Sequence, residues 1–449
     1  MVIGYESETA ISNHTITIHT SNLFDSKRKV FEKDTSIEVN TKTGLITEIY
    51  KRTSPLPQPV KSPDIDLCHL TVVPGFVDAH THVFLHPYAE TPAINQIRDE
   101  STVERIVRAT NHCRAALLAG YTTYRDLGTE GLGDADVHLR DTINRGIIPG
   151  PRLFVATEPI SSSGGYDVRQ ENGMPGRTSA PRMSDCGDGP WAGRAAVRRR
   201  LGAGADVIKF YADYGKRALR FPMEAWPGAK PIQFPPDGAG FASERNPNLL
   251  LFTQEEMDAI VAEAKFARAP VAAHAGGPDG VLMAAKAGVT TIEHGYEKNK
   301  DDQAFRIMRD NATIFVPTLS VLELFYPRNG AFETILEQTK EAYEEDVKLA
   351  CGGDTGPFAH GDNAHEMELM IEAGVPVLDV LQAATLHGWE ACGGAWCGRK
   401  FGCLEEGCAA DIVALKGDPM QDIKALRQVD FVMKDGRVWK QNGNAIGMV

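Results

Sequence analysis

The stretch Gly75-Phe76-Val77-Asp78-Ala79-His80-Thr81-His82 is a short apolar run that ends in two histidines. On an extended chain alternate side chains point to the same side, so His80 and His82 are expected to project together from the end of a strand. Neutral imidazole is a common ligand of zinc and similar divalent ions, which makes the pair a candidate start of a metal site. Two packed or surface histidines are the ordinary alternative, and the rest of the chain must discriminate between the two.

Composition and charge limit the class of protein. The 449 residues suit two domains or one large barrel with an appendage. Apolar content of 42% and charged content of 24% are typical of an ordinary globular protein. The net charge of -13 argues against nucleic acid or an anionic membrane as the main partner.

The chain shows no targeting segment or cysteine framework. It lacks an apolar run of the roughly 18 residues that a membrane helix needs, and Met1–Ala10 lacks the basic start and apolar core of a secretory signal. The eight cysteines include no C-x-x-C pair. One grouping has spacings that fit neither zinc ribbons nor zinc fingers: Cys392, Cys397, Cys403 and Cys408. We therefore expect free thiols and a cytoplasmic location.

Both ends of the chain predict β-structure. Alternating apolar and polar residues near the N-terminus are followed by a proline-rich linker, Ser54–Pro63. Near the C-terminus, Ala410–Leu415 and Val429–Met433 predict two more strands. The simplest assembly is one small β-sandwich built from residues 1–73 and 404–449.

Residues 74–403 alternate short apolar strands with helices, which predicts parallel strands with helical crossovers. Predicted helices include Val103–Ala119, Asp362–Ala373, Pro376–Cys392 and Gln254–Ala267, the last with Thr253 and Glu256 as a capping box. Eight candidate strands lie near Gly75–His80, Tyr121–Asp126, Arg152–Ala156, Asp206–Phe210, Val271–His274, Thr290–His294, Thr313–Thr318 and Val347–Asp354. Eight such units predict an α/β fold of the (β/α)8 TIM-barrel type.

In a TIM barrel the active site lies at the C-terminal ends of the strands. Those ends carry His80, His82, Lys209, His274, His294 and Asp354. Each residue alone has an ordinary structural interpretation, such as a packed histidine or a turn aspartate. Their coincidence on five strands favours a metal site.

The same residues carry a resemblance to a known family. The chain resembles the amidohydrolase superfamily from about Ile16 to Val438, and within it the branch of imidazolonepropionase-like proteins, Xaa-Pro dipeptidases and ochratoxinase. The matching motifs are Pro74–His82, Gly120–Asp126, Val207-Ile208-Lys209, His274, Glu293-His294-Gly295, Gly353-Asp354-Thr355 and Gly407–Val413.

The resemblance implies a binuclear centre with two divalent metal ions, taken as zinc. His80, His82 and Asp354 would hold one ion and His274 and His294 the other, with Lys209 bridging them as an N-carboxylated lysine. The resemblance also assigns catalytic roles to Asp354, His294 and Lys209. Two ions of this kind polarise a carbonyl and generate hydroxide at neutral pH, and Asp354 would then move the proton to the leaving nitrogen.

Substrate contacts are expected from two loops. Where relatives often have Gly-Gly-His-Gly, this chain has Gly164-Gly165-Tyr166-Asp167, which places Tyr166 toward the substrate. An excursion of about forty residues after Phe210 is long for a connecting loop and is interpreted as a lid. Further candidates for substrate contact, including binders of a carboxylate, are Arg169, Arg177, Tyr211, Lys216 and Arg217.

The sequence thus predicts a metal-dependent hydrolase that cuts a C–N bond of a small molecule, such as an N-acyl amino acid or a dipeptide. The alternatives are hydrolysis of a cyclic amide or imidazolone-type ring, a metal-dependent decarboxylase, and a metal-binding protein without catalysis. A proton-transfer residue such as Asp354 has no purpose in a protein that only binds. We further expect a homo-oligomer with no nucleic-acid or membrane partner.

Overall fold

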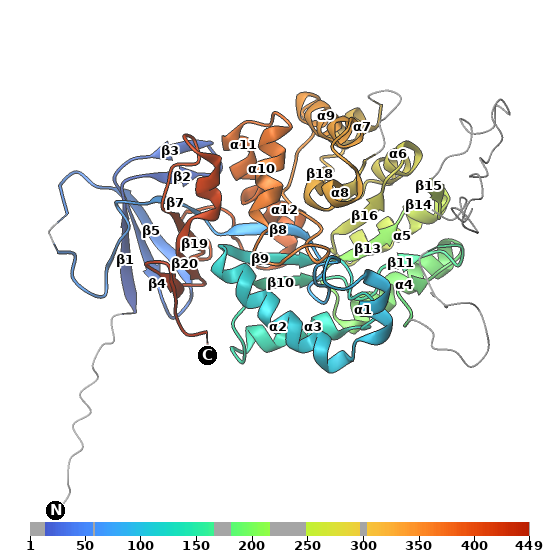
Figure 1. Ribbon diagram of the computed structural model, residues 1–449, viewed down its shortest axis with the longest axis horizontal. Helices are drawn as coiled ribbons and strands as arrows, with labels where there is room; N and C mark the ends of the chain where they lie inside the picture. The colour runs from blue at the N-terminus through green and yellow to red at the C-terminus, as the bar shows by residue number, and fades with distance from the viewer. Residues whose placement is uncertain (1–13, 57–58, 166–180, 216–247, 297–302, 449) are drawn as a thin grey trace, which may run out of the picture.

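The computed structural model describes residues 14–56, 59–165, 181–215, 248–296 and 303–448. The chain has a mixed α/β fold with two differently built regions. Strands from both chain ends lie at one side, and strands from the middle of the chain lie at the other, surrounded by helices (Figure 1).

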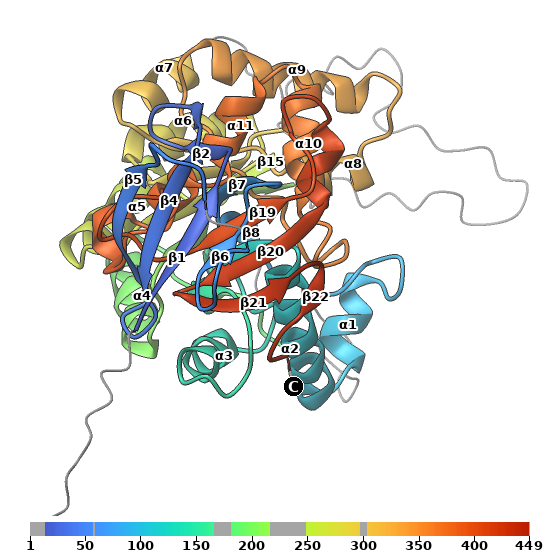
Figure 2. The same cartoon turned by 90° about the vertical axis from the view of Figure 1, so that its left-hand side faces the viewer.

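The two chain ends share a β-sheet. A seven-stranded sheet has the order β22 (Asn444–Ala445), β21 (Arg437–Gln441), β20 (Val429–Lys434), β19 (Ile412–Leu415), β7 (Thr71–Pro74), β2 (Leu23–Asp25) and β3 (Val30–Glu32). The two ends meet where β19 pairs antiparallel with β7, with Ile412 opposite Pro74. Figure 2 shows the blue N-terminal and red C-terminal strands together on this side of the molecule.

A second sheet contains only N-terminal strands: β5 (Leu45–Lys51), β4 (Thr35–Asn40), β1 (Thr15–Thr20) and β6 (Ile65–Asp66). One hydrophobic cluster contains residues of both sheets, among them Ile18 and Ile37 from the four-stranded sheet and Val72, Ile412 and Phe431 from the seven-stranded sheet. Burial of these side chains is the main favourable contribution that joins the sheets.

The middle of the chain forms parallel strands in two sheets. One has the order β10 (Arg152–Val155), β9 (Tyr121–Asp126) and β8 (Phe76–Thr81). The other has the order β12 (Asp185–Cys186), β11 (Ile160–Ser161), β13 (Ile208–Tyr211), β16 (Val271–Ala275), β17 (Thr291–His294) and β18 (Ile314–Val316). Seven of the eight predicted strands are therefore present, and an antiparallel pair, β14 (Asp213–Gly215) with β15 (Asn248–Leu250), follows β13.

The eighth predicted strand, Val347–Asp354, was wrong as a regular strand, and the described strands form no single closed sheet. This segment makes only isolated bridges, because Gly352 and Gly353 are followed by Asp354 at a positive φ of 57°. It still connects its neighbours by hydrogen bonds. Phe315 NH bonds to Lys348 O (2.8 Å), and Ala79 NH bonds to Cys351 O (2.9 Å).

Helices fill the connections between these strands. They are α1 (Ala93–Asp99), α2 (Thr102–Leu118), α3 (Ala135–Asn144), α4 (Pro190–Ala203), α5 (Gln254–Phe266), α6 (Pro278–Ala287), α7 (Gln303–Asp310), α8 (Leu319–Phe325), α9 (Ala331–Glu344), α10 (Ala364–Glu372), α11 (Val377–Ala383) and α12 (Leu386–Ala391), with 3-10 turns η1 (Gly394–Cys397) and η2 (Ile423–Arg427). Over the described ranges, none of them combines the length and apolarity required to cross a bilayer.

Two helix predictions show what local sequence can and cannot specify. The capping box at the start of α5 is confirmed, with Thr253 and Glu256 bonded reciprocally. The single helix predicted for Pro376–Cys392 was wrong, because it is divided into α11 and α12 at Thr385. That residue has φ -134° and ψ -88°, and its hydroxyl donates to Leu381 O (2.6 Å).

Candidate metal centre

The predicted ligands come from parallel strands of both central sheets. His80 lies in β8 and His82 directly follows it, while Lys209 is the second residue of β13, His274 lies near the end of β16 and His294 ends β17. Parallel strands present their C-terminal ends at one edge, so these side chains meet although they are far apart in sequence.

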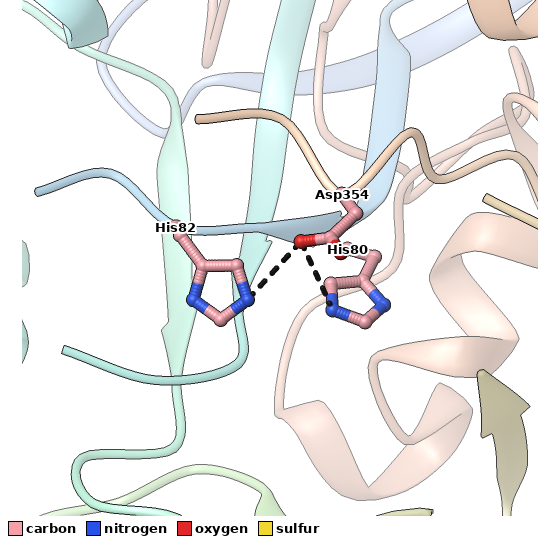
Figure 3. Close-up of side chains that lie close together, drawn as sticks. All are labelled: His80, His82 and Asp354. Atoms are coloured by element: carbon pink, nitrogen blue, oxygen red, sulfur yellow. Dashed lines mark ion pairs between the residues drawn. The ribbon is translucent and has the colours of Figure 1, made fainter. Parts of the chain in front are cut away.

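The rings lie close together. Ring centroids are 5.5 Å apart for His80 and His82, 5.0 Å for His80 and His294, and 4.4 Å for His274 and His294. Asp354 reaches the group from the segment after β18. Its Oδ1 lies 3.2 Å from His82 Nε2 and 3.6 Å from His80 Nε2, and Figure 3 shows both imidazoles facing this carboxylate.

Three histidines are held through their other ring nitrogen. His80 Nδ1 lies 2.9 Å from Glu293 Oε2, and His82 Nδ1 lies 2.9 Å from Gly128 O. His294 Nδ1 lies 2.8 Å from Thr318 Oγ1. A carboxylate or carbonyl partner requires Nδ1 to donate, which leaves the lone pair on Nε2 and directs it into the site.

Glu293 belongs to a buried charge network. Its Oε1 accepts from Arg125 Nη2 (2.8 Å) and also from the hydroxyl of Thr291. Burial alone would raise the pKa of Glu293, but the charge of Arg125 and the contact with His80 lower that pKa to about 2. Glu293 is therefore an ionised acceptor that fixes the orientation of His80.

A second buried carboxyl group, Asp78, ties the histidine strand to the Asp354 segment. It accepts from His80 NH (3.0 Å), from the Thr355 hydroxyl (2.8 Å) and from Asn363 Nδ2 (2.6 Å). Burial raises the pKa of Asp78 to about 6. These contacts set the position of Asp354 relative to His80.

The electrostatics suit metal ligation. Burial lowers the pKa of His80 to about 4, and it holds the pKa of His274 and His294 well below the usual value, so all three rings are neutral. Burial also lowers the pKa of His82, but the hydrogen bond and charge of Asp354 outweigh it and raise that pKa to about 10. A divalent cation between His82 and Asp354 would take the place of the proton that the pair shares.

Lys209 is 2% exposed, and its Nζ atom has no hydrogen-bond partner within the described part of the chain. Burial lowers the pKa of Lys209 to about 8, so a fraction of the amine is neutral near pH 7. Asp354 Oδ1 is also buried, and it lies 3.2 Å from His82 Nε2 and 3.6 Å from His80 Nε2. Buried atoms such as Lys209 Nζ and Asp354 Oδ1, beside four imidazoles, are typical of side chains that bind a metal ion. The residues present therefore fit a metal centre.

Backbone strain is present at the site. Four non-glycine residues there have positive φ: His294 (80°), Asp354 (57°), Thr318 (53°) and Glu130 (53°). Such conformations cost of order 1 kcal/mol or more each and persist where surrounding contacts enforce them, commonly at functional sites.

The candidate ligands line a cavity of about 410 Å³. Its wall is mainly aromatic and aliphatic, with one further carboxylate. Besides the ligands, the lining residues are Leu85, Tyr88, Ala93, Glu130, Tyr211, Tyr214, Tyr296, Val321, Leu322, Phe325, Tyr326 and Pro357. The volume suits a small molecule.

Of the predicted substrate contacts, Tyr211 lies in the cavity wall, with its ring 4.8 Å from that of His274. The other candidates, Tyr166, Arg169, Arg177, Lys216 and Arg217, lie outside the described residues. So does most of the proposed lid, of which the structure describes only the two ends, in β14 and β15.

Sequence reasoning missed several wall residues. Tyr296 follows His294 by two positions, so its nearness to the ligand was a usable signal. Tyr88, Phe325 and Tyr326 come from a loop and from the region of α8, and no local pattern marks them. Glu130 was also missed, although it follows β9 closely.

Comparisons with known proteins agree with this geometry. The model of the amidohydrolase family matches residues 71–439. Ochratoxinase of Aspergillus niger is 28% identical over 403 residues, which cover 83% of this chain and 76% of that protein.

Solved structures give the same result. A Xaa-Pro dipeptidase with methionine bound in its active site is 30% identical, with a TM-score of 0.76 and coverage of 95% of this chain and 100% of that one. The A. niger ochratoxinase structure, at 24% identity and a TM-score of 0.76, covers 97% and 98% and supports the fold. Because the family model spans most of the sequence, the chain belongs to the amidohydrolase family.

Proposed function

We propose that this chain is a metal-dependent hydrolase that cuts the C–N bond of an N-acyl amino acid, a dipeptide or a related small molecule. One observation carries the proposal: His80, His82, His294 and Asp354 converge. Each of the three histidines is held by a contact at its Nδ1 atom, which leaves the other ring nitrogen to face the site. The family and the names of two relatives, ochratoxinase and a Xaa-Pro dipeptidase, support the same reaction type.

The ligand assignment follows the donor chemistry. His80, His82 and Asp354 form one group whose ligand atoms all lie within 4.8 Å of one another, suited to a first divalent ion. His274 and His294 would bind a second ion, and carboxylated Lys209 would bridge the two. Imidazole and carboxylate donors suit zinc, which is our assignment.

When bound, the metals would supply Lewis-acid polarisation of a carbonyl group and a lowered pKa for water. The chain's own residues do the rest. Asp354 Oδ1, ionised and adjacent to the donor atoms, accepts the proton of the attacking water and passes it to the leaving nitrogen. The pKa of Asp354 lies well below its usual value, since the charges of His80 and His82 outweigh the effect of burial.

The cavity wall binds the substrate and excludes water. Tyr211 and Tyr214 lie on one side, their rings 5.5 Å apart, and Tyr296 and Tyr326 lie together at the same separation. Such rings favour an apolar or aromatic group on the substrate. Tyr166, Arg169 and Arg217 remain proposed contacts to the substrate.

The proposal extends to the architecture. The hydrogen bonds of Lys348–Thr355 to β18 and β8 support an eight-membered barrel in which this segment takes the eighth place. We assign residues 74–403 to the barrel and residues 1–73 and 404–449 to one β-sandwich, supported by the hydrophobic cluster between the two terminal sheets.

The test uses zinc-loaded protein and a panel of N-acyl amino acids, dipeptides and cyclic amides, followed by mass spectrometry. Release of an amine is expected. Asp354→Asn should lower kcat by about 100-fold or more while keeping the fold. Asp346→Asn is a matched control, because Asp346 also has a positive φ (59°) but is exposed.

Three results would count against the proposal. Release of carbon dioxide would indicate a decarboxylase, and an Asp354→Asn enzyme with full activity would remove this residue from the mechanism. Absence of turnover on the whole panel, with metal bound, would favour a binding protein.

A further inference from the structure

Two members of the cysteine grouping lie in direct contact. Cys403 Sγ and Cys408 Sγ are 2.9 Å apart, and the residues are 3% and 0% exposed. The other two members, Cys392 and Cys397, pack in a different hydrophobic cluster. The contact therefore selects one pair from a grouping whose spacing fits no standard zinc motif.

A tight turn enforces this contact. The turn is closed by Ala409 NH donating to Lys400 O (2.8 Å). Gly402 has a φ of 74°, and a Cβ atom there would lie 2.4 Å from Thr385 O, so only glycine fits. Gly407 also has a positive φ, 82°. The backbone of this turn thus holds the two thiols in contact.

The surroundings of the two thiols lower the pKa of Cys408 and contain two ammonium groups, which oppose a bound cation. Glu405 is paired with two ammonium groups, those of Lys27 (2.6 Å) and Lys400. The hydrogen bond from Cys403 lowers the pKa of the Cys408 thiol, with a smaller contribution from the charge of Lys400, and it outweighs burial and the charge of Glu405, which raise that pKa. A metal ion would have three donors here, two thiols and Glu405, but it would face both lysines.

We propose that Cys403 and Cys408 are an oxidisable pair that forms an intramolecular disulfide with hydrogen peroxide as the oxidant. Peroxide is small and neutral, which suits a buried site. The inference does not depend on the proposed hydrolase function, because the pair lies in the cluster between the two terminal sheets.

The reaction balances in two steps. The Cys408 thiolate attacks one oxygen of hydrogen peroxide, the O–O bond breaks, and a sulfenic acid and hydroxide form. The Cys403 sulfur then attacks the Cys408 sulfur, the S–S bond forms, and the sulfenic oxygen leaves as hydroxide. The two thiol protons convert both hydroxides to water, so two thiols and one peroxide yield one disulfide and two waters.

The disulfide would close a short loop that is hydrogen-bonded to distant N-terminal segments. Ile46 NH donates to Cys408 O (2.9 Å), and Gly407 NH donates to Ile46 O (2.9 Å). The Ser26 hydroxyl donates to Gly402 O (2.8 Å). The turn thus attaches to N-terminal strands, and its covalent closure should raise the melting temperature modestly, by about 2 °C for so short a loop in a chain of this size.

The experiment treats the reduced full-length protein with hydrogen peroxide, blocks remaining thiols and digests with trypsin. The peptide Phe401–Lys416 contains Cys403 and Cys408 and no other cysteine. It should lose two hydrogen atoms in mass and take up no blocking group, and a reductant should reverse both changes. Cys403→Ser should abolish the product, whereas Cys113→Ala, at a buried cysteine outside the pair, should retain it.

The alternatives have distinct outcomes. A peptide that stays a dithiol while the partly buried Cys68 is oxidised overturns the inference, as does conversion to sulfonic acids without a disulfide. Metal content is the second readout. The double variant Cys403→Ala/Cys408→Ala should retain the metal content of the unmodified protein, and loss of one equivalent would show a metal site instead.

Discussion

Glu293 Oε2 lies 2.9 Å from His80 Nδ1, and both side chains are almost fully buried. The same carboxylate contacts Arg125 through its other oxygen. One residue therefore neutralises a buried guanidinium and orients a metal-ligand candidate, which couples the stability of the core to the geometry of the site.

Glu293→Gln should weaken metal binding by about 10- to 100-fold, because an amide at this position is a poorer acceptor for the imidazole NH. A competition titration with a chromogenic chelator measures this. Asp136→Asn is the matched control, since Asp136 is also buried but accepts from the backbone NH groups of Val137 and Thr157. Equal metal affinity in the two variants would show that Glu293 has only a structural role.

The stability of metal-free protein should depend on pH through Glu293. Its pKa is lowered from 4.5 to about 2 in the folded state, so the unfolded chain binds the proton more tightly. The stabilisation is present above pH 4.5 and is lost as the pH falls toward 2, and its full size is about 3 kcal/mol. Urea unfolding across this range should show a flatter dependence for Glu293→Gln than for the unmodified protein. Parallel curves would contradict the assignment.

Lys209→Ala should lose most activity and most of the second metal, with partial recovery when a short carboxylic acid is added. The acid supplies the anionic oxygen donors that a carboxylated lysine would provide. Lys434→Ala is a suitable control, because burial lowers the pKa of Lys434 as well, yet it lies in β20 among the terminal strands. Normal activity and metal content in Lys209→Ala would identify Lys209 as a packing residue.

Tyr326→Ala should raise KM for substrates with an aromatic or apolar group by about 3- to 10-fold, the effect of losing one aromatic contact. The Tyr296 ring, 5.5 Å away, would also lose its partner. Phe266→Ala provides the comparison, since Phe266 is 89% exposed at the end of α5. An unchanged KM would contradict a role for Tyr326 in substrate binding.

The sequence by itself determined the features that depend on local order. His80 and His82 share one side of a strand because alternate residues do so, and the capping box of α5 forms within four consecutive residues. The ligand candidates could be inferred from the predicted strand ends, because every parallel strand presents its C-terminus at the same edge.

Tertiary structure alone decided the features that depend on contacts between distant segments. The segment before Asp354 departs from a regular strand, and only its hydrogen bonds to β18 and β8 show that it lies between them. Asp78 meets Asn363, Arg125 meets Glu293, and Tyr88 and Phe325 reach the cavity from separate connections. No periodicity encodes such pairs, because they arise only when burial brings separate parts of the chain into contact, and each buried polar group must then find its partner there.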